Sequence, residues 1–196
     1  MIFDLIYDLQ LHYREVPDVH PTGDLLLYYV EGDPTKVVCP DVYVVKGVGK
    51  EPLNTFKVWE HGGRVPCLVI EVTSESTSDE DLEKKDTYLR LGVEELFVFD
   101  PLAEYLSPRL QGFRLRSGRY VAITPQEDGS LASATTGLLH RYASPSQCRL
   151  GAACRPRDAA QEEEAWRREV EARLATAAEE ELARLRRELK DGSLNR

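Results

Sequence analysis

Two acidic residues stand on apolar, strand-like runs of this 196-residue chain. Asp41 follows a proline and opens the run at 42–45, and Glu71 lies near the end of the run PCLVIEV at 66–72. A carboxylate on a buried strand is costly unless it is paired or binds a metal. Two carboxylates on strands of one sheet can share a divalent cation, because Mg²⁺ is typically held by one or two carboxylates together with substrate phosphate.

A lysine on the helix that follows could complete such a centre. Its ammonium would orient the attacking water or stabilise the charge that develops on a scissile phosphate, which is the chemistry of a nuclease. A plainer interpretation has Asp41 capping a strand and Glu71 facing solvent. Spacing alone leaves both interpretations open.

The elements that must position these acids follow from hydrophobic periodicity and turn residues. The run at 66–72 is apolar throughout and predicts a buried central strand, as does LFVFD at 96–100. Between them, Ser78 can cap a helix over 78–91 that Gly92 ends. Strand, helix and strand of this length predict a parallel pair joined by a crossover. The other expected elements are an amphipathic helix from residue 2 to about 16, a hairpin of 24–30 and 37–46, a short helix around 56–60, a hairpin of 112–115 and 120–123, and a strand at 131–139.

The C-terminal part of the sequence differs from the rest. Residues 143–157 are small and polar and predict a linker, and residues 191–196 predict a disordered end. Residues 158–190 are rich in Ala, Glu, Arg and Leu, and predict one long helix of the coiled-coil type. Its apolar seam consists of Trp166, Val170, Leu174, Ala178, Leu182, Leu185 and Leu189. Because such a strip is uncommon on soluble monomers, we expect a homodimer through 158–190. The plainer alternative is a frayed, partly helical tail.

Five blocks in order resemble a known family: PDVYVV (40–45), WEHGG (59–63), PCLVIEVTSEST (66–77), a lysine, tyrosine and glycine spaced by four (84–93), and ELFVFDP (95–101). Together they are similar to the Uma2 endonucleases, also called DUF820, a branch of the PD-(D/E)xK nuclease superfamily. The resemblance covers roughly residues 5 to 140. It implies a nuclease-like domain at 1–142 with an α/β, restriction-endonuclease-like core, in which helices flank a mixed central sheet and a long C-terminal helix follows.

The resemblance also implies a site. Asp41 and Glu71 would bind Mg²⁺ or Mn²⁺, and the substrate would be DNA. The superfamily's lysine normally lies two residues after the second acid, where this chain has Thr73. Lys84 and Lys85 on the following helix compete for its role, and we favour Lys84 because a one-residue deletion is easier to absorb in the loop at 74–79 than within a helix.

Charge and hydropathy limit the partners. The formal net charge is −9, so any contact with DNA must be local or bridged by metal. This acidity slightly favours an alternative, a catalytically silent nuclease fold that serves as a binding or assembly module through its coiled-coil tail. No apolar run approaches the roughly 18 residues of a membrane span, so we expect no membrane contact. The four cysteines show no regular disulfide pattern, which favours a reducing, cytoplasmic setting.

Overall fold

The computed structural model describes residues 2–73, 78–144 and 147–151. Contacts divide the chain into two units, Met1–Ala153 and Cys154–Arg196. The first unit contains the elements described below. The predicted helix at 158–190, its dimer and the end at 191–196 lie outside the described residues, as does most of the predicted linker.

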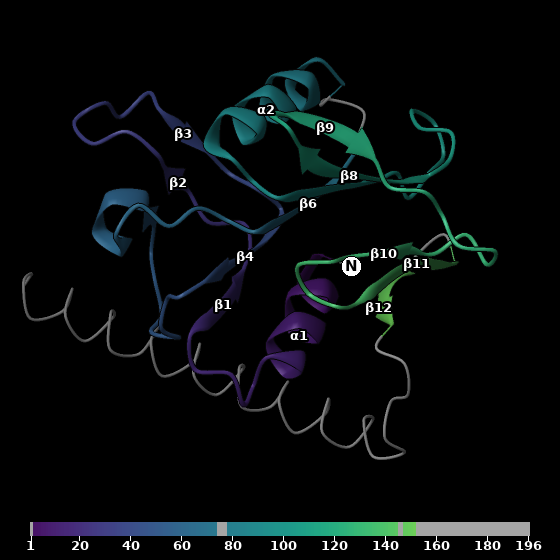
Figure 1. The fold of residues 1–196 in the computed structure, drawn as a ribbon, viewed down its shortest axis with the longest axis horizontal. Coiled ribbons are helices and arrows are strands. Elements are labelled where there is room, and N and C mark those ends of the chain that lie inside the picture. The colour runs from purple at the N-terminus through teal and green to yellow at the C-terminus, as the bar shows by residue number, and fades with distance from the viewer. Residues whose placement is uncertain (1, 74–77, 145–146, 152–196) are drawn as a thin grey trace, which may run out of the picture. The chain divides into compact units, whose positions relative to one another are not determined.

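A mixed six-stranded sheet forms the centre of the first unit, in the order β1-β4-β6-β7-β8-β9 (Figure 1). Its central strands β6 and β7 are parallel, and every other neighbouring pair is antiparallel. The helix α2 connects β6 to β7, which confirms the predicted strand, helix and strand. The bounds are β1 (Val19–Thr22), β4 (Val42–Lys46), β6 (Leu68–Val72), α2 (Ser78–Leu91), β7 (Glu95–Phe99), β8 (Leu110–Arg116) and β9 (Arg119–Ala122).

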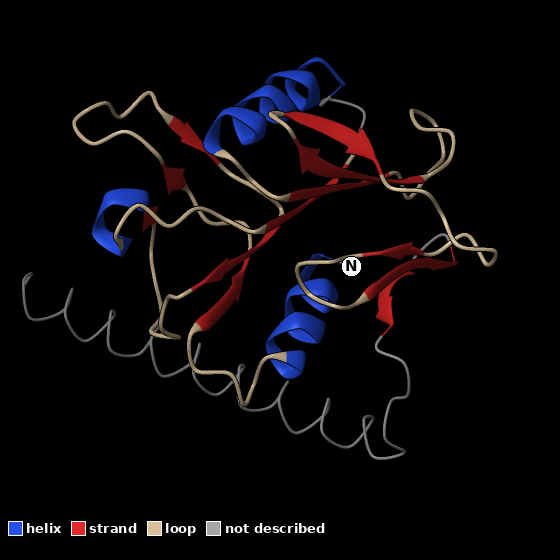
Figure 2. Ribbon diagram, in the orientation of Figure 1, coloured by secondary structure: helices blue, strands red, loops and turns tan. Residues whose placement is uncertain are grey.

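Two small sheets complete the strands (Figure 2). The first has the order β3-β2-β5, and the second has the order β10-β11-β12. A short 3₁₀ helix follows β5, close to the expected helix at 56–60. The bounds are β2 (Leu27–Tyr28), β3 (Val37–Val38), β5 (Phe56–Lys57), the 3₁₀ helix (Val58–His61), β10 (Leu131–Ala132), β11 (Leu139–Ser144) and β12 (Gln147–Gly151).

Three expectations need correction. The predicted hairpin of 24–30 and 37–46 is real only as the short pair β2 and β3, because β4 leaves it to join β1 and β6 in the large sheet. The strand expected at 131–139 is two separate strands, β10 and β11, joined by a loop. Strand β12 lies where a linker was expected, so regular structure continues to Gly151.

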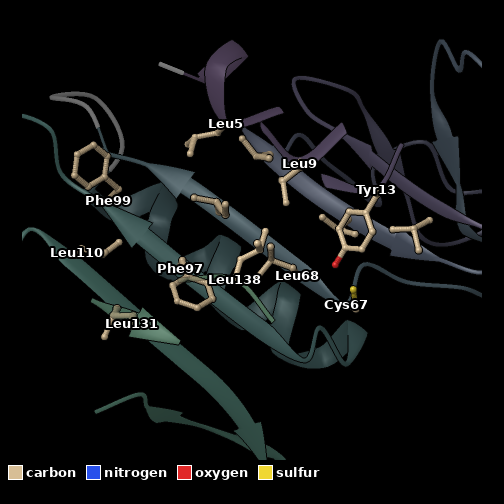
Figure 3. Packing of buried hydrophobic residues seen from close by; sticks show 14 residues of the cluster. Leu5, Leu9, Tyr13, Cys67, Leu68, Phe97, Phe99, Leu110, Leu131 and Leu138 are labelled. Carbon is tan, nitrogen blue, oxygen red and sulfur yellow. The ribbon is translucent and has the colours of Figure 1, made fainter. Parts of the chain in front are cut away.

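The two helices cover opposite faces of the large sheet (Figure 1). Helix α1 (Ile2–His12) packs its apolar stripe on one face, as its spacing predicts. Figure 3 shows Leu5, Leu9 and Tyr13 over Leu68 and Phe97. On the α2 face, Tyr88 belongs to a cluster with strand residues such as Tyr43, Val69 and Leu96. No helix in the described part of the chain is long and apolar enough to cross a membrane.

Because side chains alternate along a strand, this arrangement fixes where the acids point. Ile70 packs on the α1 face, and Val69 packs on the α2 face. The side chain of Glu71 therefore belongs to the α2 face, under the helix that carries both candidate lysines.

Candidate nuclease site

The register of β4 and β6 brings the two acids to the same place. Val42 pairs with Ile70, so the next antiparallel pair along the two strands is Asp41 and Glu71. The Asp41 carboxylate also bonds across the strands, since its Oδ2 accepts a hydrogen bond of 2.7 Å from the backbone N–H of Val72. The two carboxylates thus lie side by side where the pairing of β4 and β6 ends.

Glu71 is buried, with only 4% of its surface exposed, and both of its oxygens have partners on α2. Lys84 Nζ lies 2.9 Å from Oε2, and the hydroxyl of Tyr88 donates a 2.5 Å hydrogen bond to Oε1. Lys84 and Tyr88 are four residues apart, so they lie on one face of the helix, one turn from each other. One helical face therefore holds the whole carboxylate.

Burial is the largest influence on the pKa values of Glu71 and Tyr88. It raises the pKa of Glu71 from 4.5 to about 7, although the charge of Lys84 and the hydrogen bond from Tyr88 act in the opposite direction. Burial and the neighbouring Glu71 charge likewise raise the pKa of the Tyr88 hydroxyl, which keeps it a donor. Holding Glu71 ionised therefore costs folding free energy, and any cation that binds beside it relieves that cost.

The structure gives the two candidate lysines different surroundings. Lys84 contacts Glu71, whereas Lys85 Nζ lies 3.5 Å from the centre of the Phe113 ring, in a cation–π contact. Burial lowers the pKa of Lys85. The side chains brought together are thus Asp41, Glu71 and Lys84, and Lys85 lies beside them over an aromatic ring.

Sequence reasoning assigned no role to two further residues near the acids. Tyr88 appeared there only as the tyrosine of the block at 84–93, although its spacing of four from Lys84 places both residues on one helical face. Cys39 has no such signal. Its Sγ lies 3.9 Å from Asp24 Oδ1, and burial raises the pKa of its thiol, with the charges of Asp24, Asp41 and Glu71 adding to the rise and that of Lys84 opposing it.

Two other buried carboxylates prove to be structural. Asp100 accepts four backbone N–H groups of the loop that follows it, and these bonds lower its pKa although burial acts to raise it. Glu95 lies on the α1 face, and its carboxylate accepts hydrogen bonds from the side chains of Arg114, Ser133 and Thr135. Against the effect of burial, these bonds lower the pKa of Glu95 to about 2. Neither group is left to bind a ligand, and each ties a loop to the sheet.

The chemistry of the acid pair suits a hard divalent cation. The donors that this pair offers are carboxylate oxygens, and the Lys84 ammonium pairs with the buried Glu71. Residues 2–73, 78–144 and 147–151 contain no group of three or more His, Cys, Asp or Glu that could hold a metal. Mg²⁺ commonly takes one or two carboxylates from the protein and completes its coordination with water and substrate phosphate, so the two carboxylates fit an ion of this kind.

The model of the Uma2 family, described as "Putative restriction endonuclease", matches residues 2–143. The chain belongs to the Uma2 family. One solved structure that this Uma2 chain resembles is that of a "putative nuclease belonging to DUF820" from Anabaena variabilis, at 14% identity and a TM-score of 0.47, covering 67% of this chain and 69% of the other. No functionally curated protein matches this chain. Its family description points to a nuclease, a hydrolase that acts on DNA.

Proposed function

We propose that this Uma2 protein is a metal-dependent endonuclease that hydrolyses phosphodiester bonds of DNA. Asp41 and Glu71 would hold Mg²⁺ or Mn²⁺, and Lys84 would lie at the scissile phosphate. The observation that carries the proposal is the set of three side chains: Asp41 directly before β4, Glu71 on the adjacent strand β6, and Lys84 of the crossover helix at 2.9 Å from Glu71. Its position inside the family match, at residues 2–143, supports it.

Each side chain has a separate task in this proposal. The bound metal would supply Lewis acidity and lower the pKa of water, which favours attack on phosphorus. Lys84 places a positive charge beside Glu71, where it can stabilise the negative charge that develops on the phosphate oxygens. Tyr88 fixes the orientation of the Glu71 carboxylate through its hydrogen bond. Asp41 is oriented by the backbone N–H of Val72.

The acidic charge of the chain limits how DNA is held. A net charge of −9 provides no general attraction for a phosphate backbone, so binding depends on local cations. Lys84 and Lys85 are two such cations at this site. The same acidity favours the second candidate, a silent nuclease fold that binds or assembles without cleaving.

Cleavage assays separate these functions. The purified full-length protein would be incubated with supercoiled plasmid and with single-stranded circular DNA, in Mg²⁺, in Mn²⁺ and in EDTA. We expect cleavage only with a divalent ion, and its loss in Asp41→Asn, which keeps an acceptor for the Val72 N–H. A matched control is Glu94→Gln, which removes an exposed carboxylate. Cleavage that persists in EDTA or in Asp41→Asn would refute the assigned centre.

Metal binding gives an independent test of the silent alternative. A cation that binds only the folded state raises the melting temperature. We expect Mn²⁺ to stabilise the wild type and not Asp41→Asn. A folded protein that neither cleaves DNA nor responds to millimolar Mn²⁺ would support the silent binding module.

A further inference from the structure

A cavity of about 250 Å³ adjoins the acid and lysine pair. It lies between α2 and the strands β6, β7 and β8, on the face of the sheet to which Glu71 belongs. Glu71 and Lys84 form part of its wall, and the rest is largely apolar. Leu96 and Val98 of β7 and Phe113 of β8 all face this side of the sheet and line it. The site thus has a polar centre with an apolar pocket directly beside it.

The outer wall of the cavity comes from the loop that follows β7. Tyr105 and Leu106 line the cavity, and Tyr105 is still 40% exposed. This loop is held firmly, because Oδ1 of Asp100 accepts the N–H groups of residues 102 and 103 and Oδ2 accepts those of Tyr105 and Leu106. The buried carboxylate of Asp100 therefore holds the loop that places the exposed Tyr105 side chain beside the candidate centre.

The polar groups of the cavity have the chemistry of a nucleotide site. Lys85 carries a positive charge above the Phe113 ring, and Lys84 carries another beside Glu71. The Gln111 amide also lines the cavity and can both donate and accept hydrogen bonds. A nucleobase combines two flat apolar faces with a polar edge, and its strand brings phosphates to the cations. The apolar walls and aromatic rings complement the faces of the base, the Gln111 amide complements its edge, and the two lysines complement the phosphates.

We propose that this cavity binds an unpaired nucleobase of the strand whose phosphate lies at Glu71 and Lys84. The position of that phosphate rests on the function proposed above. A base in a duplex cannot enter, because its faces are stacked and its edge is paired, and extruding it costs free energy. The preferred substrate is therefore single-stranded or locally unpaired DNA. Tyr105 is the residue on which the base stacks at the mouth of the cavity.

Binding without cleavage tests this inference. The full-length protein in EDTA would be titrated against labelled DNA of about twelve nucleotides in three forms: single strand, duplex, and a single strand whose central residues are abasic. Since stacking of one base on an aromatic ring is worth roughly 1–3 kcal/mol, we expect the single strand to bind about five-fold tighter than the abasic strand, or more. We expect the duplex to bind as weakly as the abasic strand.

Variants of the loop localise the effect. Tyr105→Ala should lose about five-fold or more of the affinity for the single strand and none for the abasic strand. Tyr105→Phe, which keeps the ring, should bind like the wild type. The matched control is Leu102→Ala, because Leu102 is 64% exposed on the same loop and does not line the cavity. Melting temperatures would show that all three variants are folded.

Each outcome bears on one proposal. Equal binding of normal and abasic strands, an unchanged Tyr105→Ala, or no binding of any oligonucleotide would overturn the base pocket. Metal-dependent cleavage of DNA with no dependence on Tyr105 would overturn the pocket and leave the nuclease standing. Base-dependent binding by a protein that never cleaves would keep the pocket and remove the nuclease.

Discussion

Replacing Glu71 by glutamine should make the protein more stable while removing its activity. The carboxyl has a pKa of about 7 in the folded chain against 4.5 ordinarily, so the folded state holds a proton that the unfolded state has lost between these pH values. Stability therefore falls as pH rises through this window. At 1.36 kcal/mol per pKa unit, ionised Glu71 costs roughly 3 kcal/mol of folding free energy above pH 7. Glutamine has the shape of the neutral acid and avoids this cost.

The assay is chemical denaturation of wild type and Glu71→Gln across the pH range, without metal. We expect the variant to be more stable by up to roughly 3 kcal/mol at about pH 8, and the difference to disappear below pH 4.5. Glu94→Gln, at an exposed position, should stay within about 0.5 kcal/mol of the wild type throughout. Mn²⁺ should stabilise the wild type and leave Glu71→Gln unchanged. A variant that is equally stable or less stable at about pH 8 would refute the claim that burial sets the energetics of this carboxylate.

Four other predictions concern the helix lysines, two buried groups and the tail. Lys84→Ala should lower the cleavage rate by roughly 10²–10³-fold, whereas Lys85→Ala should leave the rate of the chemical step near that of the wild type; equal losses measured at saturating DNA would contradict this. Burial lowers the pKa of His140 from 6.5 to about 4, so between these pH values the unfolded state binds a proton that the folded state excludes. As pH falls through that window, the wild type should lose up to roughly 3 kcal/mol of stability relative to His140→Phe. Parallel curves of stability against pH for the two proteins would contradict this prediction. Asp100→Ala should destabilise the fold by roughly 1–3 kcal/mol in denaturation experiments, since it leaves four backbone N–H groups without their acceptor; an unchanged midpoint would argue against the loop being held this way. Light scattering should find the full chain dimeric and Leu182→Asp monomeric, and a monomeric wild type would contradict the tail prediction.

Local signals account for the parts of the fold that the sequence predicted. Helix α2 begins at Ser78 and ends before Gly92, as capping and stop residues indicate. The apolar runs at 66–72 and 96–100 form the parallel central strands, in keeping with the continuous hydrophobicity of strands that are buried on both faces. The pairing of β4 could not be predicted in the same way. Its apolar run fits a hairpin with 24–30, but in the folded chain it pairs with β1 and β6 and is buried on both faces of the sheet, by contacts that join segments distant in sequence.

Only those parts of the candidate site could be predicted that depend on the type and position of individual residues. A carboxylate on an apolar run is unusual in itself, so Asp41 and Glu71 stand out from the amino-acid sequence alone. Which lysine faces Glu71 depends on the rotation of α2 about its axis, and that is set by the packing of Tyr88 in the core. The cavity could not be predicted, because its walls come from elements distant in sequence that meet only in the folded chain.

The bond between Asp41 and the Val72 N–H has a consequence for how the proposed activity could be lost. In a sheet this N–H would normally be satisfied by a backbone carbonyl, and here a side chain takes that place. In the proposed enzyme Asp41 would serve both the chemistry and the end of the strand pairing, whereas Glu71 would serve the chemistry at a cost in stability. If a relative no longer had the proposed activity, replacing Glu71 by a neutral residue would raise its stability, because the cost of burying the charge would disappear. Loss of Asp41 would leave the Val72 N–H without its acceptor unless a residue such as asparagine replaced it, so we expect Glu71 to be lost before Asp41.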